Sequence, residues 1–493
     1  MGSARGRARR GVALLLTGCA LALAGQATAA TKEPAAPKAG RLDRSFNGDG
    51  KVVTVLPVGG GGGGNPTYRF PFEFAAGRMA MAPAGGGKLV VASHRAIVEY
   101  LATGRPNPRF GGNGAVPVGR IEGLRFRLAD VAVDSQGRVL IAGTTKPNDE
   151  VGMSGPPVPG PVPSVATIRR YNPNGQLDPS FGTEGVLNTT LGAQPPTFEG
   201  KPYPGAAVAV VGLAVDQADR PIVTGSAVAE VGLCAPSQSR FQRSQAIVAR
   251  LAANGAPDPT FADNGIESIG GLSWLGLPLP TSSGVISVGS NVDPCPRGGG
   301  PDAPSVLTSL ASDGGINQGF SAGGFWSRAF TRISDLVVAP SGKLVLLART
   351  IELSHGEWVE SAGEAIRLRR NGSFDTSFGH GGRADVQLPR HSAIAAIATD
   401  AKGRVLLAGT VIHQLRHKKR SQLRFLLIRT TAAGEPDDRF GRGGRVTTTF
   451  GRRSNVLATD VLVDAAGRIS VGGKLSGPAT GDAFALARYL GGQ

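Results

Sequence analysis

The chain has 493 residues, among them 74 glycines and 35 prolines, while aromatic residues make up only 5%. This composition is typical of many short strands joined by turns and excludes a protein built from long helices. The formal net charge of +17 favours anionic partners in general. Because the basic residues are spread along the chain and aromatic residues are scarce, we expect no nucleic-acid partner.

The first 29 residues have the three parts of a secretory signal peptide. A head rich in arginine precedes an apolar run over residues 11–25, and residues 27–29 form a small-residue cleavage site. The stretch LTGC ends at Cys19 and also fits a lipobox, which would make Cys19 the lipidated residue of an anchored lipoprotein. The apolar run continues past Cys19, which favours the signal peptide. We expect an exported protein, secreted or at the cell surface, with a linker over residues 30–40 and no transmembrane segment in the mature chain.

One short motif recurs along the rest of the chain. LDPSFG at 177–182 returns with variations as LDRSFN at 42–47 and FDTSFG at 374–379. The phenylalanine of the motif marks seven copies, at Phe46, Phe110, Phe181, Phe261, Phe320, Phe378 and Phe440. The chain therefore contains a repeat whose length varies through insertions.

The residues between two motifs follow a fixed order. DVAVDSQGRVLIAGT at 130–144 predicts a β-hairpin with an Asp-x-x-Gly turn, in which Gly takes a positive φ and Asp bonds the turn backbone. A third strand follows, as in ATIRRYNPNG at 166–175, and a short fourth strand lies behind the next motif. Seven units of four antiparallel strands predict an all-β fold, a seven-bladed β-propeller over residues 41–493.

The two ends of the chain share one unit. Residues 51–55 read as a fourth strand without the first three, and the last unit stops at Tyr489, after its third strand. An open solenoid would need atypical caps at both ends. We therefore expect the ring to close by pairing of residues 51–55 with the strand around Ala483–Tyr489.

The recurring stretches LDPSFG, VAVDSQGRVLIAG and RRYNPNG resemble the delta-60 repeat family of exported bacterial β-propeller proteins, and more distantly the NHL-type propeller repeat. The resemblance covers nearly all of residues 41–490. It implies that the first strand of each unit is innermost and the fourth outermost, and it implies no particular activity. The fourth blade fits least well, because its first strand must lie in LSWLGLPLP at 272–280, which contains two prolines. Within the motif, we expect the Asp to fix the turn and the Phe to pack between blades.

No catalytic residues, metal site or cofactor site can be assembled from the spacing of residues. The six histidines are scattered, and the pair His413 and His417 has no acidic partner nearby. Propellers can nevertheless build a site across blades. The alternative function is therefore a propeller hydrolase or lyase acting on polysaccharide, which predicts several carboxylates converging at one mouth of the central channel.

The long insertions fall between second and third strands, or between a fourth strand and the next blade, and these connections share one face of a propeller. They cover residues 147–164, 191–205, 226–244, 290–304, 350–363 and 411–422. Elaborated loops on a rigid scaffold are where recognition usually resides. The candidate binding patch is Arg416, His417, Lys418, Lys419 and Arg420. We expect a non-enzymatic, monomeric binding or scaffolding module whose partner is an unknown protein or an anionic glycan.

Cys234 and Cys295 are the two cysteines that follow the signal peptide. Each lies in the connection between the second and third strands of its unit, and the two units are adjacent. In an exported protein such a pair favours a disulfide over two free thiols. We therefore expect Cys234 and Cys295 to be linked on the loop-bearing face.

Overall fold

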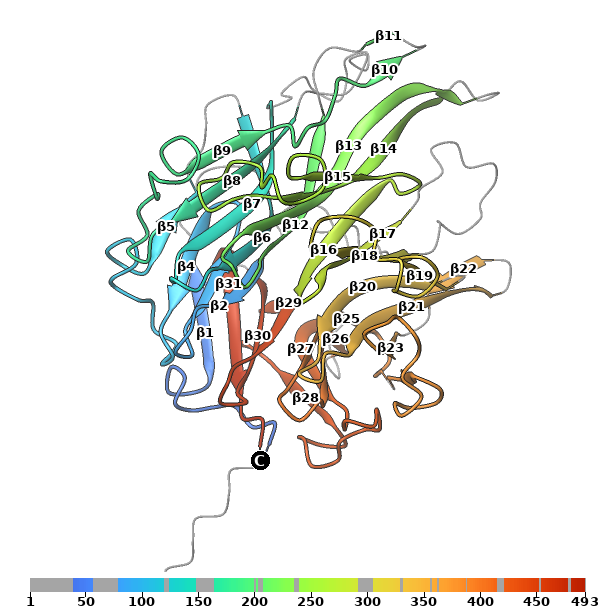
Figure 1. Ribbon diagram of the computed structural model, residues 1–493. Coiled ribbons are helices and arrows are strands. Elements are labelled where there is room, and N and C mark those ends of the chain that lie inside the picture. The colour runs from blue at the N-terminus through green and yellow to red at the C-terminus, as the bar shows by residue number, and fades with distance from the viewer. Residues whose placement is uncertain are drawn as a thin grey trace, which may run out of the picture. The chain divides into compact units, whose positions relative to one another are not determined.

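The repeats fold into seven β-sheets, which are the blades of a β-propeller (Figure 1). The computed structural model describes residues 39–55, 79–118, 124–147, 164–198, 201–202, 207–234, 239–290, 305–328, 331–354, 357–360, 363–386, 388–414, 421–451, 454–477 and 480–492. The signal-peptide and linker predictions therefore fall almost wholly outside the described residues. In the part of the chain that is described, no helix is long and apolar enough to cross a membrane.

Each blade contains four antiparallel strands, which follow one another in the chain except in blade 7, where the fourth strand is β1. Blades 1 to 3 consist of β2 (Ala80–Pro83), β3 (Leu89–Ala92), β4 (Ala96–Tyr100) and β5 (Ala115–Pro117); β6 (Leu124–Val133), β7 (Val139–Pro147), β8 (Val165–Tyr171) and β9 (Val186–Thr189); and β12 (Val208–Val215), β13 (Pro221–Cys234), β14 (Ser239–Arg250) and β15 (Ile266–Ile269).

Blades 4 to 6 consist of β16 (Trp274–Thr281), β17 (Gly284–Ser290), β18 (Ser305–Ala311) and β19 (Phe325–Ser327); β20 (Thr331–Val338), β21 (Leu344–Ser354), β23 (Glu364–Leu368) and β24 (Arg383–Asp385); and β25 (Ser392–Thr399), β26 (Val405–Gln414), β27 (Ser421–Arg429) and β28 (Arg445–Thr448). Blade 7 consists of β29 (Asn455–Val463), β30 (Ile469–Gly477), β31 (Thr480–Tyr489) and β1 (Lys51–Val55). The first strand of blade 4 lies where the sequence placed it, in spite of its prolines.

The first strands of the seven blades contact one another in an unbroken cycle. The cycle runs β2, β6, β12, β16, β20, β25, β29 and back to β2. These strands therefore surround the central channel, which confirms that the first strand of each unit is innermost. The apolar core is divided accordingly into seven clusters, each of which draws its residues from two neighbouring blades.

Strand β1 closes the ring. It pairs antiparallel with β31, from Lys51 opposite Ala487 to Val55 opposite Ala483 (Figure 1). Just before β1, the amide of Asp43 donates to the Arg488 carbonyl over 2.8 Å. The pairing predicted from the split unit is thus confirmed, and the two ends of the chain are held in one sheet.

The Asp-x-x-Gly turns have the predicted geometry. In blade 2, the Asp134 Oδ1 accepts hydrogen bonds from the amides of Gln136 (3.0 Å) and Arg138 (2.8 Å), and Gly137 has a φ of 77°. The Asp134 Oδ2 also accepts from Arg138 Nε over 2.6 Å. The side chains of Asp134 and Arg138 therefore both stabilise the hairpin turn.

The recurring motif joins neighbouring blades through a buried arginine. In blade 2, Asp178 accepts from Ser180 Oγ over 2.7 Å and from Arg170 Nε over 2.8 Å. The Arg170 guanidinium lies 4.7 Å from the ring centre of Phe181 and donates to the carbonyl of Ala253 in blade 3. Phe181 is fully buried, and a Cβ on Gly255 of blade 3 would lie only 3.1 Å from its ring. The expected roles are confirmed: the Asp fixes the turn and the Phe packs between blades. The arginine, which was not predicted, binds both and links them to the next blade.

Five blades carry the same triad of arginine, aspartate and phenylalanine. Its members are Arg170, Asp178 and Phe181; Arg250, Asp258 and Phe261; Arg367, Asp375 and Phe378; Arg429, Asp437 and Phe440; and Arg488, Asp43 and Phe46. Blades 1 and 4 keep the phenylalanine but use other polar pairs. Asn107 donates to Glu99 in blade 1, and Asn317 donates to Ser309 in blade 4.

Candidate functional site: the loop face and the central channel

The propeller has two unlike faces. The turn face carries the Asp-x-x-Gly turns and the motif triads, and the loop face carries the connections from second to third strands and from a fourth strand to the next blade. On the turn face, the charges of motif and turn are paired with one another; Arg220, for example, contacts both Asp216 (2.8 Å) and Asp258 (3.2 Å). The turn face is therefore built mainly for architecture.

The loop face carries a sheet that the sequence did not predict. Residues 226–244 were expected to be a loop, but β13 and β14 continue as a hairpin from Ala227 opposite Gln245 to Cys234 opposite Ser239. The expectation was wrong because a β-hairpin satisfies its own backbone hydrogen bonds and can extend beyond the blade.

A second hairpin joins this extension. Strand β10 (Thr197–Phe198) pairs in parallel with β13, and β11 (Lys201–Pro202) pairs with β10 (Figure 1). We call these two strands, together with residues 230–234 and 239–243, the blade 3 extension. Blade 5 has a smaller counterpart, in which β22 (Glu357–Glu360) pairs with β21.

Three inner strands each place one aspartate in the wall of the channel. These residues, Asp130 of β6, Asp335 of β20 and Asp460 of β29, each follow a β-bulge at the equivalent place in their strand. We call them the aspartate collar. The bulge takes up one extra residue and so redirects the side chain that follows it.

Each collar carboxylate joins two neighbouring inner strands. The Asp460 Oδ1 accepts from the Val461 amide (2.7 Å), and its Oδ2 accepts from the Met81 amide of blade 1 (3.0 Å). The Asp335 Oδ1 accepts from the Leu336 amide (2.8 Å), and its Oδ2 accepts from the Ile397 amide of blade 6 (2.7 Å).

The third member, Asp130, bonds the Val131 amide (2.8 Å) and reaches the Leu213 amide of blade 3 at 3.4 Å. Burial, the charge of Asp335 and the charge of Asp130 raise the pKa of Asp460 to about 8. The three carboxylates are therefore close enough to interact electrostatically, and Asp460 keeps its proton near neutral pH.

A layer of positive charge lies one rung nearer the loop face. Asp130 is opposite Ala142 and Arg127 is opposite Thr144; because of the bulge, Arg127 and Asp130 project from the same side of the blade. The equivalent rung pairs Arg332 with Arg349 in blade 5. We call this level the cationic rung.

The cationic rung is present in the same three blades as the collar. In blade 7 the rung pairs Leu457 with Lys474. In blades 3 and 6, which have no collar aspartate, the rung pairs Ala209 with Ser226 and Ala393 with Thr410. Sequence reasoning missed both layers. Aligning the repeats would have placed Asp130, Asp335 and Asp460 at one position, four residues before the turn, but only the closed ring shows that their charges interact.

The sites predicted from sequence fall largely outside the described residues. The patch Arg416, His417, Lys418, Lys419 and Arg420 and the cysteine Cys295 lie outside the described residues. Cys234 ends β13, and only its backbone is described. Within the described ranges, no group of three or more His, Cys, Asp or Glu side chains could hold a metal ion.

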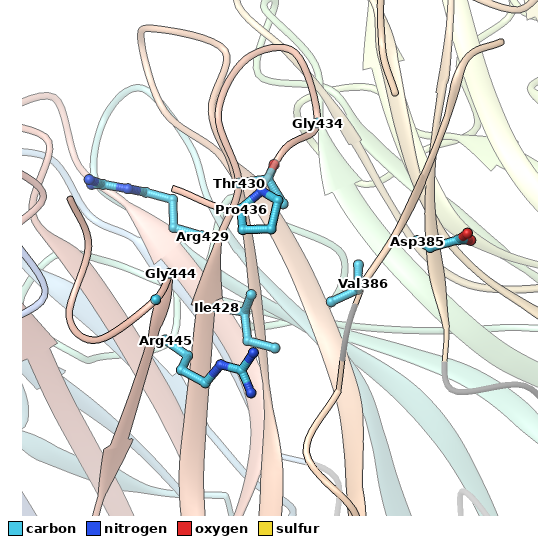
Figure 2. Close-up of a pocket in the computed structure, with 10 residues that line it drawn as sticks. Asp385, Val386, Ile428, Arg429, Thr430, Gly434, Pro436, Gly444 and Arg445 are labelled. Carbon is cyan, nitrogen blue, oxygen red and sulfur yellow. The ribbon is translucent and has the colours of Figure 1, made fainter. Parts of the chain in front are cut away.

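A small pocket, partly open to solvent, lies between blades 5 and 6. Its charged lining residues are Asp385, Arg429 and Arg445. Figure 2 shows the Arg429 guanidinium directed away from Asp385, across the crevice. Arg429 already binds Asp437 over 2.9 Å and the Gly491 carbonyl. The pocket is therefore a crevice beside a motif triad, and its charged groups do not converge on a common point.

The sequence matches a family model described as a domain of unknown function (DUF5122) beta-propeller, over residues 163–181 and 240–261. These two segments cover the third strands and motifs of blades 2 and 3. No curated protein matches the sequence.

Several solved structures are similar to this chain. A protein of unknown function from Dyadobacter fermentans DSM 18053 is 12% identical, covering 75% of this chain and 99% of its own, with a TM-score of 0.36. The polysaccharide lyase Uly1 is 9% identical, covering 86% and 91%, with a TM-score of 0.43. The Trypanosoma rangeli sialidase is 11% identical, covering 92% and 59%, with a TM-score of 0.36. The fold described above rests on the strand pairing of this chain itself.

Proposed function

We propose that the protein is an exported, non-enzymatic propeller that binds a partner at or beyond the bacterial envelope, with its loop face as the binding surface. The observation that carries this proposal is the blade 3 extension, in which two separate connections join into one sheet. An ordered platform on a rigid scaffold suits recognition. On this proposal the repeats belong to the delta-60 family, and the patch at Arg416–Arg420 adds positive charge to the same face.

A shortened hairpin tests the role of the extension. Glu230 and Arg243 are opposite each other, and the Glu230 carboxylate contacts the Arg243 guanidinium over 2.9 Å. Replacing residues 231–242 by Asn-Gly would join this pair through a two-residue hairpin turn and leave the blade intact. We expect the full-length protein to retain a component of an envelope extract that the shortened variant no longer retains.

The control is Arg439→Gln with Arg442→Gln, two exposed residues of the turn face. This variant should retain the same component as the unaltered protein. Thermal unfolding of both variants shows whether the propeller is still folded. Equal retention by the shortened and unaltered proteins would contradict the assignment of the extension as the binding surface.

The aspartate collar favours a second candidate function, a hydrolase or lyase acting on polysaccharide. A carboxyl group with a pKa of about 8 can serve as a general acid near neutral pH. This function requires that Asp460→Asn abolish cleavage of a polysaccharide while the protein remains folded. The geometry favours the binding module, because both oxygens of each collar carboxylate already accept backbone amides.

A further inference from the structure

Two blades place like charges opposite each other at the loop-face end of their inner strands. In blade 2, Arg125 is opposite Lys146, and in blade 5 Arg332 is opposite Arg349. Like charges directly opposite in an antiparallel pair destabilise the sheet. Local rules of this kind are broken mostly at functional sites.

Blade 2 concentrates these charges on one side of its sheet. Arg125 and Arg127 are two residues apart on β6, so their side chains project from the same side, and Lys146 and Thr144 lie opposite them on β7. Arg125 and Arg127 are exposed. The Thr144 Oγ1 accepts the Val210 amide of blade 3 over 2.9 Å, which fixes the neighbouring strand beside the cluster. Three cationic residues thus lie on one side of the sheet at the loop-face end of β6 and β7.

Blade 5 lies across the channel from blade 2. Along the cycle of inner strands, β6 of blade 2 is followed by β12, β16 and then β20 of blade 5. No two blades of a seven-bladed ring are further apart than this. At blade 5, Arg349 donates to the Ile394 carbonyl of blade 6 over 2.7 Å, which holds this positive pair at the mouth. A ligand that contacts both positions must therefore extend across the opening.

The guanidinium groups of Arg125 and Arg127 are exposed and lie within reach of an anion from outside. Guanidinium groups match carboxylates in geometry and charge.

We propose that the loop-face mouth of the channel binds an anionic polysaccharide lying across the opening, with carboxylates of the polymer held by Arg125 and Arg127 and with positive charge from Arg332 on the far side. This assignment rests on the proposed binding function and names its ligand class. Aromatic residues make up 5% of the chain, too few for the stacking that single-stranded nucleic acid requires.

Binding of polygalacturonate oligomers to the full chain tests the proposal. We expect measurable affinity that weakens with added salt, and none for neutral dextran. Arg125→Gln with Arg127→Gln should weaken binding about 10-fold, because it removes two charge-assisted contacts. Arg332→Gln should weaken it less. The matched control, Arg439→Gln with Arg442→Gln, removes two charges from the turn face and should leave the affinity unchanged.

The outcomes separate this proposal from the proposed function. Equal losses in the mouth and control variants, or comparable affinity for polyuridylate, would overturn the polysaccharide assignment. Retention of envelope material without affinity for polygalacturonate would also overturn it, while the binding module would stand. If the oligomers were bound at the mouth and shortened, the ligand class would stand and the non-enzymatic function would fail.

Discussion

The arginine of the motif triad in blade 5 makes three kinds of contact at once. In blade 5, Arg367 binds Asp375 Oδ2 over 2.6 Å, donates to Ser377 Oγ over 3.1 Å and to the Ala432 carbonyl of blade 6 over 2.6 Å. Burial opposes ionisation of Asp375, but hydrogen bonds from Lys343, Ser377 and Arg367 outweigh it and hold the pKa of Asp375 well below its usual range. The pair therefore stays ionised in the folded protein.

Loss of this arginine should be costly. Arg367→Met would leave buried Asp375 with Lys343 as its cationic partner and would remove the hydrogen bonds to Ser377 and to blade 6, and we expect the free energy of unfolding to fall by about 2 to 3 kcal/mol. Urea unfolding measures this change. The nearby exposed Arg369→Met should change the unfolding free energy by less than about 0.5 kcal/mol. If the two variants were equally stable, the triad would not be a principal link between blades.

Asp460 should make stability depend on pH. Its pKa is about 8 in the folded protein and about 3.9 in an unfolded chain, so between these values the folded state holds a proton that the unfolded state has released. The contribution of Asp460 to the free energy of unfolding must therefore fall as the pH rises from the unfolded pKa to the folded pKa. Asp460→Asn should make unfolding less sensitive to pH between 5 and 8 in urea titrations. Exposed Asp385→Asn is the control, and an unchanged slope in the Asp460 variant would contradict the assignment.

Among the elements, the β13–β14 hairpin shows where sequence patterns fail. Residues 226–244 do not show the sustained apolar alternation of a strand packed on a core, so the segment reads as a loop. The hairpin is set by backbone pairing with β10 and by the register of the blade below it. By contrast, the spacing of eight residues between Arg170 and Asp178 recurs in Arg250 and Asp258, and this signal was readable in the sequence.

The hairpin also bears on the expected disulfide. Cys234 is at the tip of β13, opposite Ser239, and we predict that its thiol is linked to that of Cys295. The bridge would stabilise the fold by about 4 kcal/mol on the chain-entropy model. Peptide mapping without reductant should recover the two cysteine peptides joined. Recovery of two separately alkylated peptides would remove the bridge.

At the scale of the whole molecule, stability depends on closure of the ring. Strand β1 and the pair of Asp43 with Arg488, which are joined over 2.8 Å, connect the two ends of the chain. Deleting residues 41–56 would expose the edge of β31 and leave the Arg488 guanidinium without Asp43. We expect a lower melting temperature and aggregation. A truncated protein that was as stable and monomeric as the intact one would show that closure does not depend on this strand.

The sequence by itself determined the number of blades, the four strands of each, the Asp-x-x-Gly turns and the closing strand. The blades, strands and turns repeat, and each depends on residues close together in the chain, so local patterns are sufficient to predict them. The closing strand followed from the repeat unit that the two ends of the chain share. Only the tertiary structure decided the aspartate collar, the cationic rung and the blade 3 extension. The collar residues Asp130, Asp335 and Asp460 come from blades that are far apart in the sequence, and ring closure alone brings their charges together. Their mutual repulsion acts through space across the channel, and no local pattern of residues contains it.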